Sequence, residues 1–224
     1  MPDFSYRDIA KMLDHSLLQQ VLTDSDLEAG CLLARNCDVA SVCIKPYAVP
    51  LARTILAGST VAVGTVIGFP HGGNLTAIKV DEVERALDDG ATELDMVVNI
   101  GKVLSKDEAF VRADIRAVVE TAHRRKALVK VIFENCFLKD EHKEWLCRIC
   151  GEVGADFVKT STGYGDGGAT DHDLKLMRRC SPPYVQVKAA GGVRTLERLL
   201  QVRALGVTRV GATATKAILD ACPQ

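Results

Sequence analysis

The feature that most constrains the fold is an alternation of short apolar, β-branched segments with longer segments of helical periodicity. Eight segments are expected to form strands: residues 11–16, 38–45, 60–68, 92–98, 127–134, 156–161, 184–189 and 208–212. Helices are expected at residues 25–36, 76–90, 106–125, 140–154, 170–180, 194–206 and 213–222. Eight such βα units predict either a closed (β/α)8 barrel or an open doubly wound sheet.

The closed barrel is the better interpretation of this alternation. An open dinucleotide-binding sheet carries a glycine-rich fingerprint after its first strand, and no early strand here has one. Polar residues instead recur where strands end, which is where a barrel builds its active site. We predict a single TIM barrel across residues 1–224, with a short N-terminal helix. Ser25 is the expected cap of the first amphipathic helix, and Gly90 the expected stop of the next.

Composition argues against several classes of function. The formal net charge is −1, with no long run of either sign, so neither nucleic acid nor a membrane surface is an expected partner. No apolar run is long enough to span a membrane and the N-terminal segment lacks a signal-peptide core, so a cytoplasmic protein is expected. The eight cysteines are expected to be reduced, and neither they nor the five histidines form a metal-binding motif.

A glycine pattern follows the expected strand at 156–161. Gly163, Gly165 and Gly168 fit G-x-G-x-x-G, between a strand and a helix. A dinucleotide site also needs an acidic residue at the end of the next strand, and that strand ends in Lys188. Dinucleotide binding is therefore the weaker interpretation, and the glycines are better explained as a tight turn that presents backbone donors.

Two lysines end successive expected strands. Lys159 ends "DFVK" and Lys188 ends "YVQVK". If both face the barrel interior, desolvation and like charge both disfavour protonation, so that one amine is neutral enough to attack a carbonyl. This is the chemistry of a Schiff-base enzyme. The alternative is that both are surface lysines at strand ends, which is common for one lysine but less so for two neighbours.

Other polar residues lie within the expected strands. Asp95 is inside "ELDMVV", where a buried carboxylate needs a partner such as these lysines. Lys130 is either a pocket cation or an ion-pair partner. Asp14 and Cys43, at the ends of the first two expected strands, are candidates to line the pocket, although Cys43 could equally be a core residue.

The last two expected strands are each followed by a loop suited to a phosphate. "AAGGVRT" offers Gly191 and Gly192, and "GATAT" offers Gly211 and Thr213 at the start of the final helix. The loops after strands seven and eight are the usual phosphate site of a barrel, where backbone N–H groups face the anion.

Several linked motifs resemble those of the deoxyribose-phosphate aldolase family. They are "MLDHSLL", "TVIGFPHGGN", "ELDMVVNIG", "KTSTGYG" and "VKAAGGVRT", and the resemblance extends from about Met12 to Ala217. It implies a class I aldolase without metal or other cofactor, which reversibly cleaves 2-deoxy-D-ribose 5-phosphate to acetaldehyde and D-glyceraldehyde 3-phosphate in deoxyribonucleotide catabolism. The implied partner is a small phosphorylated sugar, and a homodimer or higher homo-oligomer is left open.

The resemblance also assigns roles to individual residues. Lys159 matches the Schiff-base lysine, Lys188 the lysine that perturbs its pKa, and Asp95 the carboxylate of the proton relay. The implied substrate-pocket residues are Asp14, Cys43, Lys130 and Thr160. The implied phosphate-binding residues are Gly163, Gly191, Gly192, Gly211 and Thr213.

Three positions depart from the family pattern. Ala214 stands where a second hydroxyl is usual, Gln19 where many relatives have lysine, and Asn135 where threonine is usual. These differences keep open an aldolase of the same mechanism with another acceptor aldehyde. A non-catalytic sugar-phosphate-binding barrel is a further alternative, but such a protein would tolerate the loss of Asp95 or Lys188, and this chain has both.

Overall fold

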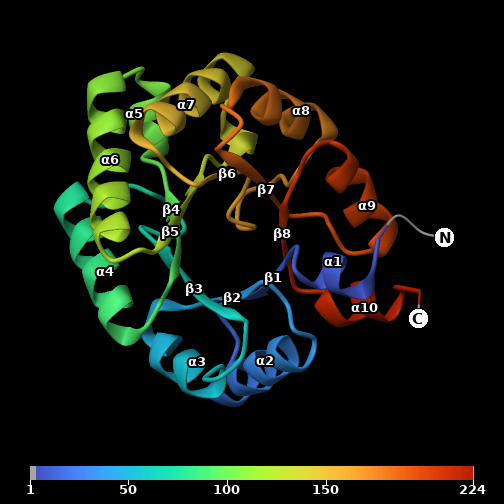
Figure 1. Cartoon of the computed structure of the whole chain (residues 1–224). Helices are drawn as coiled ribbons and strands as arrows, with labels where there is room; N and C mark the ends of the chain where they lie inside the picture. The colour runs from blue at the N-terminus through green and yellow to red at the C-terminus, as the bar shows by residue number, and fades with distance from the viewer. Residues whose placement is uncertain (1–3, 224) are drawn as a thin grey trace.

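The computed structural model describes residues 4–223, in which eight parallel strands close into a barrel (Figure 1). Each strand pairs with the next in the chain, and β1 pairs with β8 to complete the ring. The strands are β1 (Leu13–Leu17), β2 (Ser41–Ile44), β3 (Ala62–Ile67), β4 (Glu93–Val97), β5 (Leu128–Ile132), β6 (Phe157–Lys159), β7 (Gln186–Ala190) and β8 (Arg209–Ala212). The predicted (β/α)8 barrel is therefore confirmed.

Helices surround this barrel on the outside (Figure 1). They are α1 (Tyr6–Ala10), α2 (Asp24–Asn36), α3 (Val49–Ile55), α4 (Thr76–Asp89), α5 (Ile100–Leu104), α6 (Glu108–Arg124), α7 (Asp140–Val153), α8 (Asp171–Cys180), α9 (Leu196–Ala204) and α10 (Thr215–Asp220), with 3-10 turns at Pro46–Ala48 and Asn135–Phe137. The short N-terminal helix is confirmed as α1, which contacts α10. No helix in residues 4–223 combines the length and the apolar character needed to cross a membrane.

Some helix boundaries differ from the sequence prediction. The cap of α2 is Thr23, whose side chain accepts from the backbone N–H of Asp26, so the prediction of Ser25 was wrong. Gly90 does end α4, in the left-handed conformation that glycine adopts without a steric cost. Helices α3 and α5 were not predicted, because they have seven and five residues and show too little periodicity to be detected.

Side chains alternate between the two faces of each strand, and this separates two kinds of interior. Outward-facing residues such as Leu94 and Val158 are fully buried and belong to the apolar core between strands and helices. Inward-facing residues of the same strands include Asp95 and Lys159, which are also buried. The interior of this barrel therefore contains charged groups that must find partners within it.

Candidate active site

The catalytic candidates are brought together by strand register. Lys159, the last residue of β6, lies beside Lys188 of β7, and Asp95 of β4 lies beside Lys130 of β5. All four residues are at least 97% buried. Both lysines thus face the interior, and the alternative of two surface lysines is wrong. Lys159 does end β6, but Lys188 is the third of five residues in β7, so the expectation that it ends its strand was wrong.

Asp95 is the hub of these contacts. Its Oδ2 accepts hydrogen bonds from the Nζ atoms of Lys159 and Lys188, each at 2.7 Å. Its Oδ1 accepts from Nζ of Lys130 at 2.8 Å. Two ammonium groups therefore share a single carboxylate oxygen, while the third has the other oxygen to itself.

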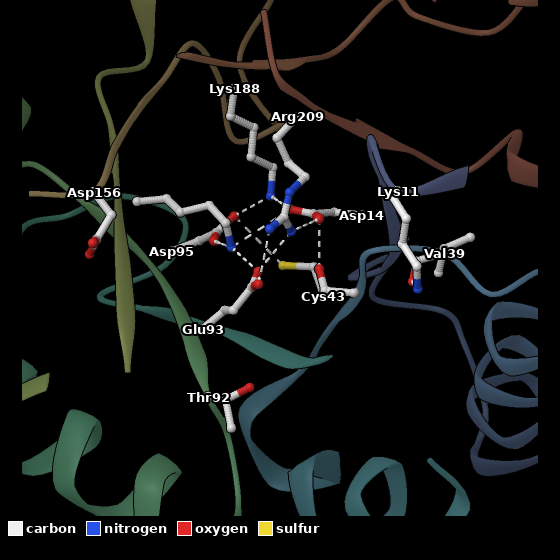
Figure 2. A network of polar contacts seen from close by, with 12 residues as sticks. Lys11, Asp14, Val39, Cys43, Thr92, Glu93, Asp95, Asp156, Lys188 and Arg209 are labelled. Carbon is white, nitrogen blue, oxygen red and sulfur yellow. Dashed lines mark hydrogen bonds and ion pairs between the residues drawn. The ribbon is translucent and has the colours of Figure 1, made fainter. Parts of the chain in front are cut away.

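A second layer of ion pairs lies deeper in the barrel, toward the first residues of the strands. Arg209, which begins β8, donates to both carboxylate oxygens of Glu93, at 2.9 and 3.1 Å, and to Asp14. Lys130 also pairs with Glu93, at 2.7 Å. Figure 2 shows Arg209 and Lys188 reaching toward Glu93, Asp14 and Asp95 from one side of the barrel. The sequence reading missed Arg209 and Glu93, although each stands at an inward-facing position at the start of a strand.

These contacts join seven side chains into one set, which we call the charged cluster. Its members are the cations Lys130, Lys159, Lys188 and Arg209 and the carboxylates Asp14, Glu93 and Asp95. Four cations face three anions. An unbalanced buried charge is costly, so the cluster is best balanced when one lysine is neutral.

The neutral member of the charged cluster is best assigned to Lys159. Burial lowers the pKa of Lys159 most; Asp95 opposes this effect and the neighbouring Lys188 adds to it. Burial also lowers the pKa of Lys188, but its ion pairs with Asp14 and Asp95 outweigh burial, so that its pKa is raised. The two lysines therefore differ because Lys188 has two carboxylate partners and Lys159 has one.

The two carboxylates that contact these lysines stay ionised. Burial alone would raise the pKa of Asp14 and of Asp95, but the surrounding lysines, joined by Arg209 at Asp14, hold both well below the ordinary range. Cys43 behaves oppositely, because burial and the charge of Asp95 raise its pKa to about 11. Its Sγ lies 3.9 Å from Asp95 Oδ2, so it contributes a neutral thiol to the site.

A cavity of about 260 Å³ opens above the charged cluster. Of the residues predicted for the site, those that line it are Lys159, Lys188, Asp14, Cys43, Gly163, Gly191, Gly192, Gly211 and Thr213. The structure thus brings the two lysines and the predicted glycine loops to one cavity. An amine of lowered pKa at the base of a cavity can attack a carbonyl carbon and form an imine.

Three predicted residues are not among those that line this cavity. Asp95 and Lys130 lie below it and contact each other. The hydroxyl of Thr160 donates to the carbonyl of Ala190 at 3.1 Å and accepts from its N–H at 3.0 Å. Thr160 therefore ties β6 to β7.

The expectation that Asp14 ends its strand was wrong. Asp14 is the second residue of β1, which continues to Leu17, while Cys43 is the third of four residues in β2. Asp14 reaches the cavity because its side chain points into the barrel rather than because the strand ends there. The strand expected at residues 11–16 stops only one residue before β1 does, so the error lay in the place of Asp14 within the strand.

Further lining residues were not predicted. They are Ser16, Leu18, Gln19, Gln20, Thr162, Tyr164, Ala190, Val193, Arg194 and Ala212. Arg194 brings a positive charge to the glycine loop after β7, and its place in "GGVRT" was the signal available in the sequence. Tyr164 comes from the loop after β6, and its hydroxyl donates to the carbonyl of Leu18 at 2.6 Å.

One group of side chains in residues 4–223 has the composition of a metal site. Asp140, His172 and Asp173 place their ligand atoms within 4.8 Å of one another, at the start of α7 and α8. The ammonium of Lys143 already pairs with Asp173 at 2.6 Å and with Asp140 at 3.4 Å. None of these residues lines the cavity above the charged cluster.

Comparisons with known proteins agree with this geometry. Residues 9–218 match the sequence model of the DeoC/LacD family aldolases. A deoxyribose-phosphate aldolase from Rhodopirellula baltica is 55% identical over 219 residues, covering 98% of this chain and 91% of the relative. One from Thermococcus kodakarensis is 46% identical over 220 residues, covering 97% and 98%.

A solved structure supports the same relationship. The tetrameric deoxyribose phosphate aldolase from Aeropyrum pernix superposes with a TM-score of 0.89 at 28% identity, covering 96% of this chain and 91% of that one. The resemblance found in the sequence motifs is therefore confirmed along nearly the whole chain. A match of this extent, with two lysines at one cavity and an aspartate below that bonds both, shows that the chain belongs to the DeoC/LacD family of aldolases.

Proposed function

We propose that this chain is a class I aldolase that reversibly cleaves 2-deoxy-D-ribose 5-phosphate to acetaldehyde and D-glyceraldehyde 3-phosphate. The observation that carries the proposal is the buried Lys159 amine of lowered pKa at a cavity, beside Asp95 and Lys188. The relatives from R. baltica and T. kodakarensis, both deoxyribose-phosphate aldolases, support the same substrate.

The first step uses the amine of Lys159 as nucleophile. Its nitrogen attacks the C1 aldehyde of the open-chain sugar, and loss of water leaves a protonated imine. The imine withdraws the electron pair of the C2–C3 bond as the C3 hydroxyl gives up its proton, which releases glyceraldehyde 3-phosphate and leaves an enamine. Protonation of C2 and addition of water then release acetaldehyde and restore the amine.

Asp95 and Lys188 are the groups placed to move these protons. Asp95 Oδ2 is 2.7 Å from the Nζ atoms of both Lys159 and Lys188, so it can accept a proton from one lysine and pass a proton to the other. Lys188 keeps its proton because Asp14 and Asp95 stabilise the charged form. We assign Lys188 as the proton donor of the relay and Asp95 as the carboxylate that links it to Lys159.

The phosphate is assigned to the part of the cavity that the glycine loops line. Gly163, Gly191 and Gly192 have φ values of 90°, 82° and 87°, a conformation that glycine adopts readily and other residues do not. They line the cavity together with Gly211, Thr213 and the cationic side chain of Arg194. Backbone N–H groups and one guanidinium suit a phosphate dianion.

Trapping of the covalent intermediate tests the nucleophile. The protein is reduced with borohydride in the presence of acetaldehyde, and the adduct is mapped by mass spectrometry. We expect a single ethylated lysine, Lys159, with Lys79 as an internal control because it is also buried but pairs with Asp114 outside the barrel. An adduct on another lysine alone, or no adduct, would contradict the proposal.

The remaining expectations stay predictions. We propose a single domain over residues 1–224 and a reaction without metal or other cofactor, so that a chelator should leave activity intact. The A. pernix relative is tetrameric, which favours a homo-oligomer, the possibility that the sequence left open. The cytoplasmic location rests on the sequence alone.

A further inference from the structure

Glu134 stands out by its backbone and its burial. It follows β5 with a φ of 57°, in the left-handed region that favours glycine, and the residue is only 2% exposed. The residues on either side are fixed to the end of β6: Phe133 N donates to Lys159 O at 3.0 Å and Asn135 N to Thr160 O at 2.9 Å. A strained conformation of this kind persists where the surroundings determine it, often at a functional site.

The carboxylate of Glu134 holds the loop that follows the nucleophile. Its Oε1 accepts from the backbone N–H of Thr162 at 3.1 Å, and its Oε2 accepts from the Thr162 hydroxyl. The same hydroxyl oxygen accepts from the backbone N–H of Tyr164 at 3.0 Å. Tyr164 in turn donates to the carbonyl of Leu18, which follows β1 and also lines the cavity. One carboxylate thus begins a series of hydrogen bonds across the cavity wall.

Stability alone is a poor explanation for this carboxylate. No ion pair in residues 4–223 involves Glu134, so its desolvation is offset by hydrogen bonds from Thr162 rather than by a buried cation. The other buried carboxylates near the barrel axis, Asp14 and Asp95, are both paired with lysines. Glu134 therefore differs from them in having only the loop as its partner.

The loop over residues 162–168 is also packed against its neighbours on both sides. A Cβ on Gly165 would lie 2.7 Å from Cys136 Sγ and 3.2 Å from the carboxyl carbon of Glu134. A Cβ on Gly168 would lie 2.6 Å from the carbonyl oxygen of Gly191. The N–H of Ala169 donates to that same oxygen at 3.0 Å. The loop therefore connects Glu134 to the glycine turn after β7.

We propose that Glu134 is a positioning residue, which holds residues 162–164 so that the backbone of Gly163 faces the phosphate of the substrate. It acts on binding at the phosphate end of the cavity, through Thr162, and not on the chemistry at Lys159. The identity of the bound anion rests on the proposed function; the positioning of the loop does not.

The substitution Glu134→Gln tests this directly, because it changes one oxygen to an NH₂ group with little change of shape. An NH₂ facing the Thr162 N–H would set two donors against each other, and one facing the Thr162 hydroxyl would compete with Tyr164 N–H for its oxygen. We expect faster amide hydrogen exchange at residues 160–168. We also expect the KM for deoxyribose 5-phosphate to rise about tenfold, the effect of one lost charge-assisted contact, with kcat within about twofold.

Matched substitutions separate positioning from a general loss of stability. Thr162→Val should reproduce the effects of Glu134→Gln. Thr162→Ser keeps the hydroxyl, so its KM and its exchange at residues 160–168 should be those of the parent protein. Thr121→Val is the control, because the Thr121 hydroxyl is also buried but donates to Ala117 within α6. It should lower the melting temperature without changing either KM or exchange in the loop.

Two results would overturn the inference. One is unchanged exchange of residues 160–168 in both Glu134→Gln and Thr162→Val. The other is an equal rise of KM for deoxyribose 5-phosphate and for unphosphorylated deoxyribose, which would place the effect away from the phosphate. If the parent protein does not cleave deoxyribose 5-phosphate, the proposed function fails, and hydrogen exchange alone still decides whether Glu134 holds the loop.

Discussion

The charged cluster has two layers that differ in how completely their charges are paired. In the lower layer, both oxygens of Glu93 receive hydrogen bonds from Arg209, and Lys130 adds a third contact. In the upper layer, Lys159 and Lys188 share one oxygen of Asp95 beside the cavity. Both layers contain lysine, and Lys130, Lys159 and Lys188 are all nearly fully buried, so residue type and burial alone do not decide their chemistry.

The difference shows how one fold makes a lysine either structural or reactive. Lys130 has Asp95 and Glu93 as close partners, and their charges outweigh burial and raise its pKa. Lys159 has only a shared oxygen, and burial lowers its pKa. The number of carboxylates that each ammonium contacts therefore separates a fixed charge from a nucleophile.

The largest expected effect is on the nucleophile itself. Lys159→Met should lower turnover of deoxyribose 5-phosphate by about 10⁴-fold or more, as is usual when a covalent nucleophile is removed. Lys130→Arg, which keeps a charge in the lower layer, should lose far less. Steady-state kinetics on the two variants measure the contrast, and equal losses would show that the two layers are not functionally distinct.

Asp95→Asn should have the next largest effect. It removes the oxygen that links Lys159 to Lys188, and loss of a proton-transfer group typically costs about 10²–10⁴-fold in rate. The adduct of Lys159 with acetaldehyde should still be trapped by borohydride, because the amine remains. Loss of turnover together with loss of trapping would assign Asp95 to formation of the imine rather than to the relay.

Lys188→Met should change the pH dependence of imine formation. The protonated Lys188 helps to lower the pKa of Lys159, and its removal also leaves Asp95 freer to stabilise the charged form of Lys159. Both effects raise that pKa, so the pH at which trapping by acetaldehyde is half-maximal should move upward. Lys188→Arg keeps the charge and should move it little. An unchanged profile in Lys188→Met would make Lys188 a bystander.

The two layers should also differ in stability. Lys130→Met leaves Glu93 and Asp95 short of a buried partner, and breaking such a pair typically costs about 3–5 kcal/mol. Lys159→Met removes the member of the cluster that is assigned as neutral, so it breaks no balanced ion pair and should cost much less. Folding lowers the pKa of Lys159, so the unfolded chain keeps the Lys159 proton up to a higher pH than the folded chain does. Lys159 therefore destabilises the parent protein at pH values below its unfolded pKa. This penalty disappears as the pH rises through the unfolded pKa. Urea unfolding of both variants at neutral pH tests this order.

Ala214→Ser should have the smallest effect. Ala214 precedes α10 and caps it without a side-chain hydrogen bond, but it is not among the residues that line the cavity. An added hydroxyl would act mainly on the helix start, so we expect the KM for deoxyribose 5-phosphate to fall only about threefold, near the low end of a hydrogen bond's net contribution. The KM for free deoxyribose, measured in parallel, should not change.

The sequence by itself determined the barrel and most of the cavity. Eight apolar segments define the strands, and their period of two puts Lys159 and Lys188 each on one defined face of its strand before any contact is known. The glycine loops could be located by counting strands, because a barrel gathers the loops after its strands at one end.

Only the tertiary structure decided which charges pair. Arg209 and Glu93 are 116 residues apart and looked like ordinary strand-start residues, yet they meet across the barrel. Likewise, the role of Glu134 depends on a left-handed backbone and a contact with Thr162, and Thr160 turns out to bond Ala190 rather than to face the cavity. Closure of the barrel creates these contacts, and pKa values depend on distances within them, so periodicity along the chain predicts which face a lysine occupies but not whether it is charged.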